Sequence, residues 1–203
     1  RVTDEDLIRL KRDHPPELVR ASAAGIEGDY LLVQGLERNG FFGRSSGWHL
    51  PIYLGAKLVS IGYIWSAHLD RVNADTDQLN QMERSDISVR DFTGHDVAAW
   101  VYDLHRPDEP YAARGVHEGG LGIDRYIKPS DLTPDEMRYV EQQGWLSLIN
   151  LIDPFLLRPR GFTVTNPVND KSVQISARGG HLLTPFGYTI DADVVLQQGL
   201  IGI

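Results

Sequence analysis

Apolar residues recur at helical spacing through the N-terminal part of the chain and at every second position near its C-terminus. Capping boxes, in which a Thr and an acid three residues later satisfy free amide groups, predict helix starts at Thr3, Thr93 and Thr133. The last of these helices should end at Asp153, before a proline. Residues 70–91 have no clear period and predict an exposed connection with one short helical turn.

A second helix should begin at Pro16 and carry a run of small residues. Ala21 and Gly25, and likewise Ala24 and Gly28, are four positions apart and so lie on one helix face. Small side chains at this spacing let another helix approach closely. The pattern therefore predicts helix packing rather than a ligand loop.

The segment from Trp48 to Leu69 is apolar and about as long as a bilayer is thick, with Lys57 as its interruption. An ammonium at mid-span costs on the order of 2.5–3.5 kcal/mol unless it faces protein or water. The segment is thus either a helix packed among others at a membrane or the core helix of a globular domain.

From residue 161 onward the apolar period becomes two, which predicts strands. We expect turns at Asn169-Asp170 and at Gly179-Gly180. The fold class is therefore α+β, with an N-terminal helical region, one long apolar helix, and antiparallel strands at the C-terminus. Residues 1–157 form the helical region and 158–203 the strand region, which should pack together as one unit. The alternating apolar positions are Phe162, Val164, Val173, Ile175, Ala177, Phe186, Tyr188, Ile190, Ala192, Val194 and Leu196.

Composition narrows the classes of function. The net charge is −8 and basic residues are scattered, which argues against a nucleic-acid partner because such a partner needs a clustered basic face. The 203 residues contain no cysteine, which excludes a disulfide scaffold, a thiolate metal site and a cysteine nucleophile. The chain opens at Arg1 and closes on GLIGI, so we expect it to be a processed chain or a fragment of a longer one.

Polar chemistry concentrates between residues 95 and 125, around several glycines. His117 and Glu118 could supply a metal ligand and a general base, and Asp124 is a further candidate catalytic residue. The alternative is that His117 is a structural loop histidine hydrogen-bonded to a carboxylate. The sequence contains no complete catalytic signature, such as GxSxG or HExxH, that would decide between them.

A metal site is a related hypothesis for this stretch. His95, His105 and His117 are its candidate ligands. His95 and His105 are ten residues apart, about 15 Å along a helix, so His105 would have to leave the helix to share an ion with His95. The identity of any cofactor is unknown at this stage.

Arg114 and Arg125 flank the glycine run, and two guanidinium groups could clamp a phosphate or carboxylate of a substrate. The alternative is that each arginine pairs with a nearby acid and fixes the loop.

Two functions from different classes follow. The first is a membrane-associated protein of the bacterial cell envelope, whose partners are a lipid membrane or other membrane-protein segments. The second is a soluble, cytoplasmic α+β hydrolase with a site around His117. The length of the apolar segment favours the first hypothesis, and Lys57 favours the second.

Overall fold

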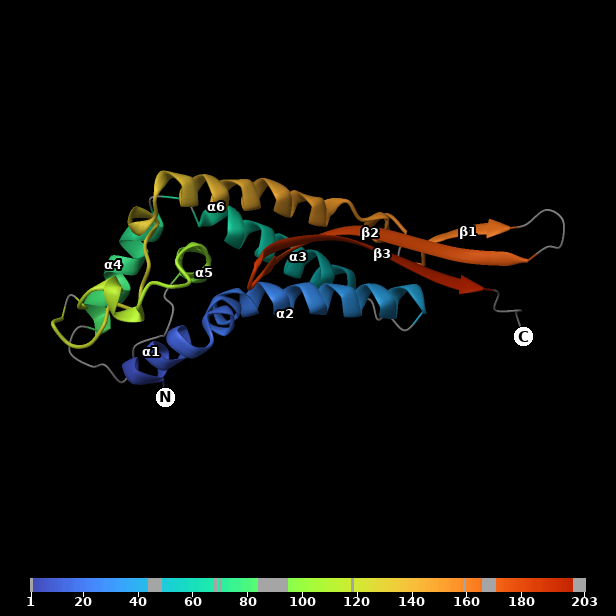
Figure 1. Ribbon diagram of the computed structural model, residues 1–203. Coiled ribbons are helices and arrows are strands. Elements are labelled where there is room, and N and C mark those ends of the chain that lie inside the picture. Colours follow the sequence, from blue (N-terminus) through green and yellow to red (C-terminus); the bar gives the residue numbers. More distant parts are fainter. Residues whose placement is uncertain are drawn as a thin grey trace. The chain divides into compact units, whose positions relative to one another are not determined.

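The computed structural model describes residues 2–43, 49–67, 69, 71–83, 95–117, 119–158, 160–165 and 171–198. Within these residues the chain forms six α-helices and, after them, one antiparallel sheet of three strands (Figure 1). The predicted α+β order is therefore confirmed. The elements are α1 (Asp4–Asp13), α2 (Pro15–Phe41), α3 (His49–Ser66), α4 (Arg71–Glu83), α5 (Asp96–His105), α6 (Pro134–Ser147), β1 (Phe162–Thr165), β2 (Ser172–Thr184) and β3 (Gly187–Gln198).

The chain divides into two compact units, which cut across the predicted boundary after residue 157. Four elements run from one unit into the other: helices α2 and α3 and strands β2 and β3. Whether 1–157 and 158–203 pack as one unit stays a prediction. Unit 1 comprises residues 1–25, 63–145 and 183–188, and unit 2 comprises residues 26–62, 146–182 and 189–203.

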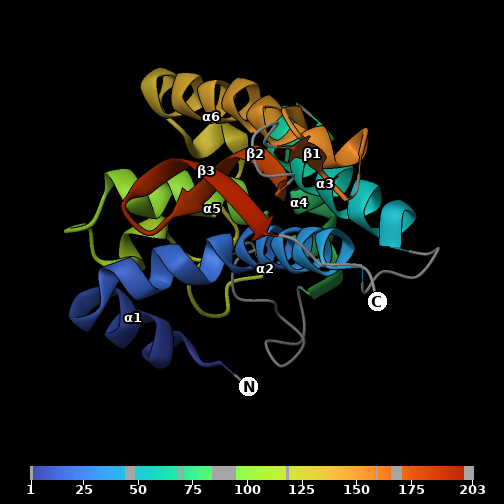
Figure 2. The same cartoon turned by 90° about the vertical axis from the view of Figure 1, so that its right-hand side faces the viewer.

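In unit 1, α5 lies between α1 and α6 (Figure 2). Its apolar stripe of Val97, Trp100 and Val101 is buried, and the Trp100 ring stacks on Tyr139 of α6 at 5.8 Å. On its other side, Asp103 forms a buried ion pair with Lys11 of α1 at 3.0 Å. Buried polar groups need such partners, so this pair fixes how α1 packs on α5.

The capping boxes at Thr3 and Thr133 are confirmed. The Asp6 amide donates to the Thr3 hydroxyl, and the Glu136 carboxylate accepts from the Thr133 amide at 2.7 Å. Helix α6 nevertheless ends at Ser147 rather than at residue 153, because two 3₁₀ turns follow it, at Leu148–Leu151 and Pro154–Leu156. Helix α5 begins at Asp96, and Thr93 lies outside the described residues.

The prediction of an exposed connection over residues 70–91 is wrong for the part that the structure describes. Helix α4 covers 13 residues and buries Val72, Thr76 and Asn80. These are four positions apart, so they form one face of the helix. Sequence reasoning missed this face because two of its three residues are polar.

The small residues of α2 do not form the predicted close contact. A side-chain carbon added at Gly25 or Gly28 would meet no atom within 4 Å, and Ala24 and Gly25 are exposed. Helix α2 is 27 residues long and begins at Pro15. Ala24, Gly25 and Gly28 are therefore exposed and do not lie against another helix backbone.

Helix α3 covers 18 residues of the predicted apolar segment, and Trp48 and His68 lie outside the described residues. Lys57 is buried rather than solvent-facing, in an ion pair with Asp153. In the described part of the chain, no helix combines the length and apolar character needed to cross a membrane. The apolar segment therefore forms a helix over residues 49–66.

Strand β2 lies between β1 and β3, and β1 pairs antiparallel with β2 so that Phe162 is opposite Ile175. The predicted turn at Gly179-Gly180 is wrong, because both glycines lie inside β2. A side-chain carbon on Gly180 would lie 2.1 Å from the Tyr30 hydroxyl, so this glycine permits a close approach rather than a turn. The turn lies at residues 185–186, and Asn169-Asp170 is outside the described residues.

Candidate functional site

His117 lies in a compact loop of unit 1 that a bridge between Val116 and Ile123 closes. Its ring is buried, and Nδ1 accepts a hydrogen bond from the Gly119 amide at 3.0 Å. An accepting Nδ1 places the proton of a neutral ring on Nε2, and this nitrogen is buried without a hydrogen-bond partner in the described structure. Glu118 lies outside the described residues.

The two predicted substrate-binding arginines both pair with carboxylates. Arg125 binds Asp4 at 2.7 Å, and Arg114 binds Asp103 at 2.6 Å and the Arg125 carbonyl at 3.0 Å. These contacts tie the loop to α1 and α5, as the structural alternative predicts. A role in substrate binding stays a prediction.

Asp124 and Arg114 line a common cleft of about 280 Å³ in unit 1. Burial raises the pKa of Asp124, while the Tyr126 amide and the nearby His117 lower it. The cleft therefore brings together two of the predicted site residues. Its full lining is Tyr102, Arg106, Ala113, Arg114, Asp124, Tyr126, Ile127, Lys128 and Asp131.

The predicted metal ligands have separate surroundings. The His95 ring stacks on Tyr63 at 5.0 Å, and His105 Nδ1 lies 3.0 Å from the Val101 carbonyl. Among the described residues, no group of three or more His, Asp or Glu side chains could hold a metal ion. The metal site predicted from His95, His105 and His117 therefore gains no support from the described geometry.

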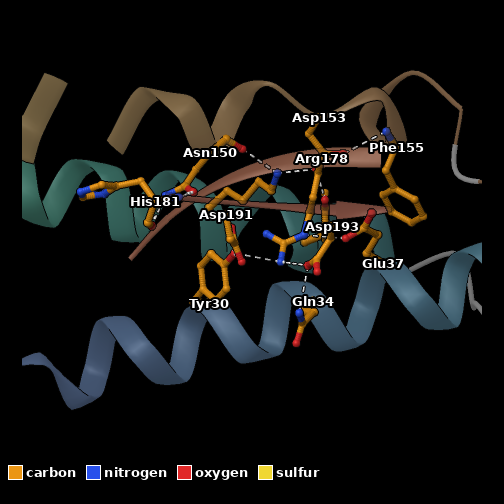
Figure 3. Close-up of polar contacts among 12 residues, drawn as sticks. Tyr30, Gln34, Glu37, Asn150, Asp153, Phe155, Arg178, His181, Asp191 and Asp193 are labelled. Atoms are coloured by element: carbon orange, nitrogen blue, oxygen red, sulfur yellow. Dashed lines mark hydrogen bonds and ion pairs between the residues drawn. The ribbon is translucent and has the colours of Figure 1, made fainter. Parts of the chain in front are cut away.

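Sequence reasoning missed a cluster of charged side chains inside unit 2, centred on Arg178 of β2 (Figure 3). The buried guanidinium lies 2.7 Å from Glu37 of α2, and it also binds Asp193 of β3 and the Tyr30 hydroxyl. Gln34 of α2 donates to Asp193 at 2.9 Å. Arg178 therefore links α2 to both long strands.

The signal for this cluster is present in the sequence. Tyr30, Gln34 and Glu37 are spaced four and three residues apart, which puts them on one face of α2. In the strands, Arg178 and Asp193 occupy the positions between apolar residues. The alternation predicts strands correctly but does not say which face is buried.

A second buried pair lies beside the first. Lys57 of α3 binds Asp153 and donates to the Asn150 carbonyl at 2.6 Å, and the Tyr53 hydroxyl also donates to Asp153. The Phe155 amide donates to the same carboxylate at 2.9 Å. Every ion in this pair thus has additional hydrogen bonds, which a buried pair requires.

Burial shifts the proton affinities of these groups. It raises the pKa of Glu37 to about 7 and lowers the pKa of Lys57. It also lowers the pKa of His181 to about 4, which leaves this ring neutral. Glu37 Oε1 has no hydrogen-bond partner among the described residues, so its neutral form is the better suited to this environment.

The cavity beside the cluster is too small for a substrate. Its volume is about 20 Å³, close to the space that one water molecule needs. The cluster therefore holds helices and strands together rather than surrounding a ligand. The lining residues are Ile26, Asp29, Tyr30, Val33, Lys57, Ser60, Asn150, Arg178 and His181.

The exterior of unit 2 is rich in exposed apolar side chains. Its apolar core contains Val33, Tyr53 and Phe155, yet many other large apolar side chains are exposed to solvent. Unit 2 thus buries charges and exposes apolar groups. The exposed residues are Leu31, Leu32, Phe42, Leu50, Ile52, Leu58, Val59, Leu151, Ile152, Leu157, Phe162, Val164, Ile190, Val194 and Leu196.

Comparison with family models, curated proteins and solved structures gave no match to this chain.

Proposed function

We propose that this is a membrane-associated protein that attaches to a membrane surface through the exterior of unit 2. The proposal rests on how unit 2 distributes its side chains: Lys57, Asp153 and Arg178 are buried, while large apolar side chains are exposed on its surface. Proteins rarely expose large apolar surfaces unless these contact lipid or a partner. In lipid-facing proteins, charged groups pair with one another in the interior.

Attachment at the interface fits this unit better than insertion across the bilayer. Strands β1 and β3 are the edges of an open sheet, and unpaired strand edges are not tolerated in the hydrocarbon region. At the interface, water and headgroups can bind these edge groups while the apolar side chains reach the acyl boundary.

The test is flotation of the purified chain with phosphatidylcholine vesicles, with and without phosphatidylglycerol. We expect the chain to float with vesicles of at least one composition. A chain that remains at the bottom of the gradient with every composition would overturn the proposal.

The cleft at Arg114 and Asp124 favours a second candidate, the hydrolase. Its support is the cleft volume of about 280 Å³ together with the unpartnered Nε2 of His117. In this case His117→Ala should abolish hydrolysis of a carboxylate or phosphate ester while the chain stays folded. Loss of folding would instead return His117 to a structural role.

A further inference from the structure

One face of the sheet of unit 2 packs on α2, and part of the opposite face is exposed. In an antiparallel ladder, paired residues point to the same side, so Phe162 and Ile175 share one face, as do Val164 and Val173. Ser176 and Arg178 of β2 lie one position out of phase with Ile175 and are buried. The face with Phe162 and Val164 is therefore the outer one, and both side chains are exposed.

Strand β3 continues this outer face. Ile190, Val194 and Leu196 each expose more than half of their surface. Asp191 and Asp193 alternate with them and bind Tyr30 and Gln34 of α2, which fixes the opposite side of β3 as the inner one. The outer face is thus apolar over β1, over residues 173–177 of β2 and over residues 190–196 of β3. Farther along β2, the same phase carries Gly179, which lies against Ile149, and the buried His181.

The exposed charge of unit 2 has one sign. Among its described residues, the exposed charged side chains are cations and every carboxylate is at least half-buried. Three of the cations flank the sheet: Arg158 and Arg160 precede β1, and Lys171 precedes β2. The Arg158 guanidinium lies over the Phe162 ring at 5.6 Å, so charge and apolar surface adjoin.

We propose that the outer face of this sheet docks on an anionic lipid surface. The apolar side chains of β1 and β3 enter the acyl boundary, and Arg158, Arg160 and Lys171 bind lipid phosphate groups. This inference rests on the proposed membrane function and names its surface and its lipid class. A symmetric pairing of two copies through the same face would bring their cations together, which weakens self-association relative to binding of an anionic lipid surface.

The experiment compares flotation with neutral vesicles and with vesicles that contain phosphatidylglycerol. The test variant is Arg158→Gln/Arg160→Gln/Lys171→Gln. Its control is Arg9→Gln/Arg12→Gln/Arg138→Gln, which removes the same charge from exposed side chains of unit 1. We expect the test variant to bind anionic vesicles on the order of 100-fold more weakly. Each cation near such a surface contributes about 1 kcal/mol, so the loss of three cations removes about 3 kcal/mol, and every 1.4 kcal/mol is about a factor of ten.

A second variant tests the apolar part. Ile190→Thr/Val194→Thr/Leu196→Thr keeps branched side chains suited to a strand and changes only exposed positions, so the fold should be retained. We expect it to lose vesicle binding, while binding of the unaltered chain weakens as salt is added. Circular dichroism checks that each variant is folded.

The outcomes separate the two proposals. Equal binding to neutral and anionic vesicles, or equal weakening by both charge variants, would overturn the anionic-lipid inference and leave membrane attachment standing. Absence of binding to any vesicle would overturn both. A stable dimer that the threonine variant dissociates, without vesicle binding, would assign the face to a second copy of the chain and overturn the inference.

Discussion

Glu37 lies on α2 with one carboxylate oxygen 2.7 Å from Arg178 and the other without a hydrogen-bond partner among the described residues. Charged groups surround it from four other segments: Arg178 on β2, Asp193 on β3, Lys57 on α3, and Asp153 between the two 3₁₀ turns. With every group ionised, the carboxylates here outnumber the cations. Burial disfavours the charged carboxylate and raises the pKa of Glu37; Asp153 and Asp193 raise it further, while Arg178 and Lys57 lower it.

This shift makes stability depend on pH. The pKa of Glu37 is about 7 in the folded chain against an ordinary value of 4.5, so the folded state binds the proton more tightly. Its contribution to stability is complete below about pH 4.5 and is lost as the pH rises through about 7. We expect Glu37→Gln, which mimics the neutral carboxyl, to flatten urea-unfolding stability between these values. Glu141→Gln, at an exposed site on α6, should retain the wild-type slope, and an unchanged slope in Glu37→Gln would contradict the assignment.

The pair of Lys57 and Asp153 leads to a second prediction at this scale. Lys57→Met leaves a buried carboxylate without its cation, which should destabilise the chain by roughly 3–5 kcal/mol. Lys57→Met/Asp153→Leu removes both charges and should be less destabilised than the sum of the single changes. Chemical denaturation of the three variants measures the coupling, and additive effects would contradict it.

Among the elements, α2 shows how one helix uses its glycines differently along its length. Gly35 has open space around it, whereas a side-chain carbon on Gly40 would lie 2.3 Å from the Phe155 ring. The helix therefore tolerates a larger residue at one position and requires glycine at the other. Sequence spacing cannot distinguish these positions, because the difference lies in what packs against them.

The matched substitutions test this difference. Gly35→Ala should stabilise the chain by roughly 0.5–1 kcal/mol, because alanine loses less backbone freedom on folding. Gly40→Ala should destabilise it, because the Phe155 ring must move out of the apolar core of unit 2. Thermal unfolding of both variants gives the comparison, and the same sign for both would contradict it.

Over the whole molecule, charge is divided unevenly between the two units. Unit 2 contains seven basic and seven acidic residues, so the net charge of −8 belongs entirely to unit 1. Charge repulsion keeps proteins apart in solution, and unit 2 lacks a net charge while exposing apolar groups. Unit 2 is therefore the part from which self-association should arise.

This leads to a prediction for the intact chain. In buffer without lipid or detergent, light scattering should give a mass above that of the 22.7 kDa monomer, and a nonionic detergent should lower the protein mass toward it. Ile190→Thr/Val194→Thr/Leu196→Thr should reduce association in the absence of detergent. If the chain is a monomer under all conditions, the exposed apolar surface of unit 2 does not cause self-association, and the prediction is wrong.

Local patterns determined much of the secondary structure. The boxes at Thr3 and Thr133 and the apolar stripe of α5 depend on neighbours three or four residues away, so the sequence alone predicted them. The period-two alternation likewise predicted the strands. Where a buried face is polar, as at Thr76 and Asn80 of α4, hydrophobic periodicity could not detect it.

The tertiary structure decided which faces are buried and which residues meet. Alternation along β2 and β3 is the same whether the apolar or the polar positions face inward, so only the packing on α2 reveals that Arg178 and Asp193 lie inside. Lys57 and Asp153 are far apart in sequence, and their pairing required the fold. Sequence determined the elements because these depend on local spacing, whereas the buried charges and the exposed apolar face depend on contacts between distant segments.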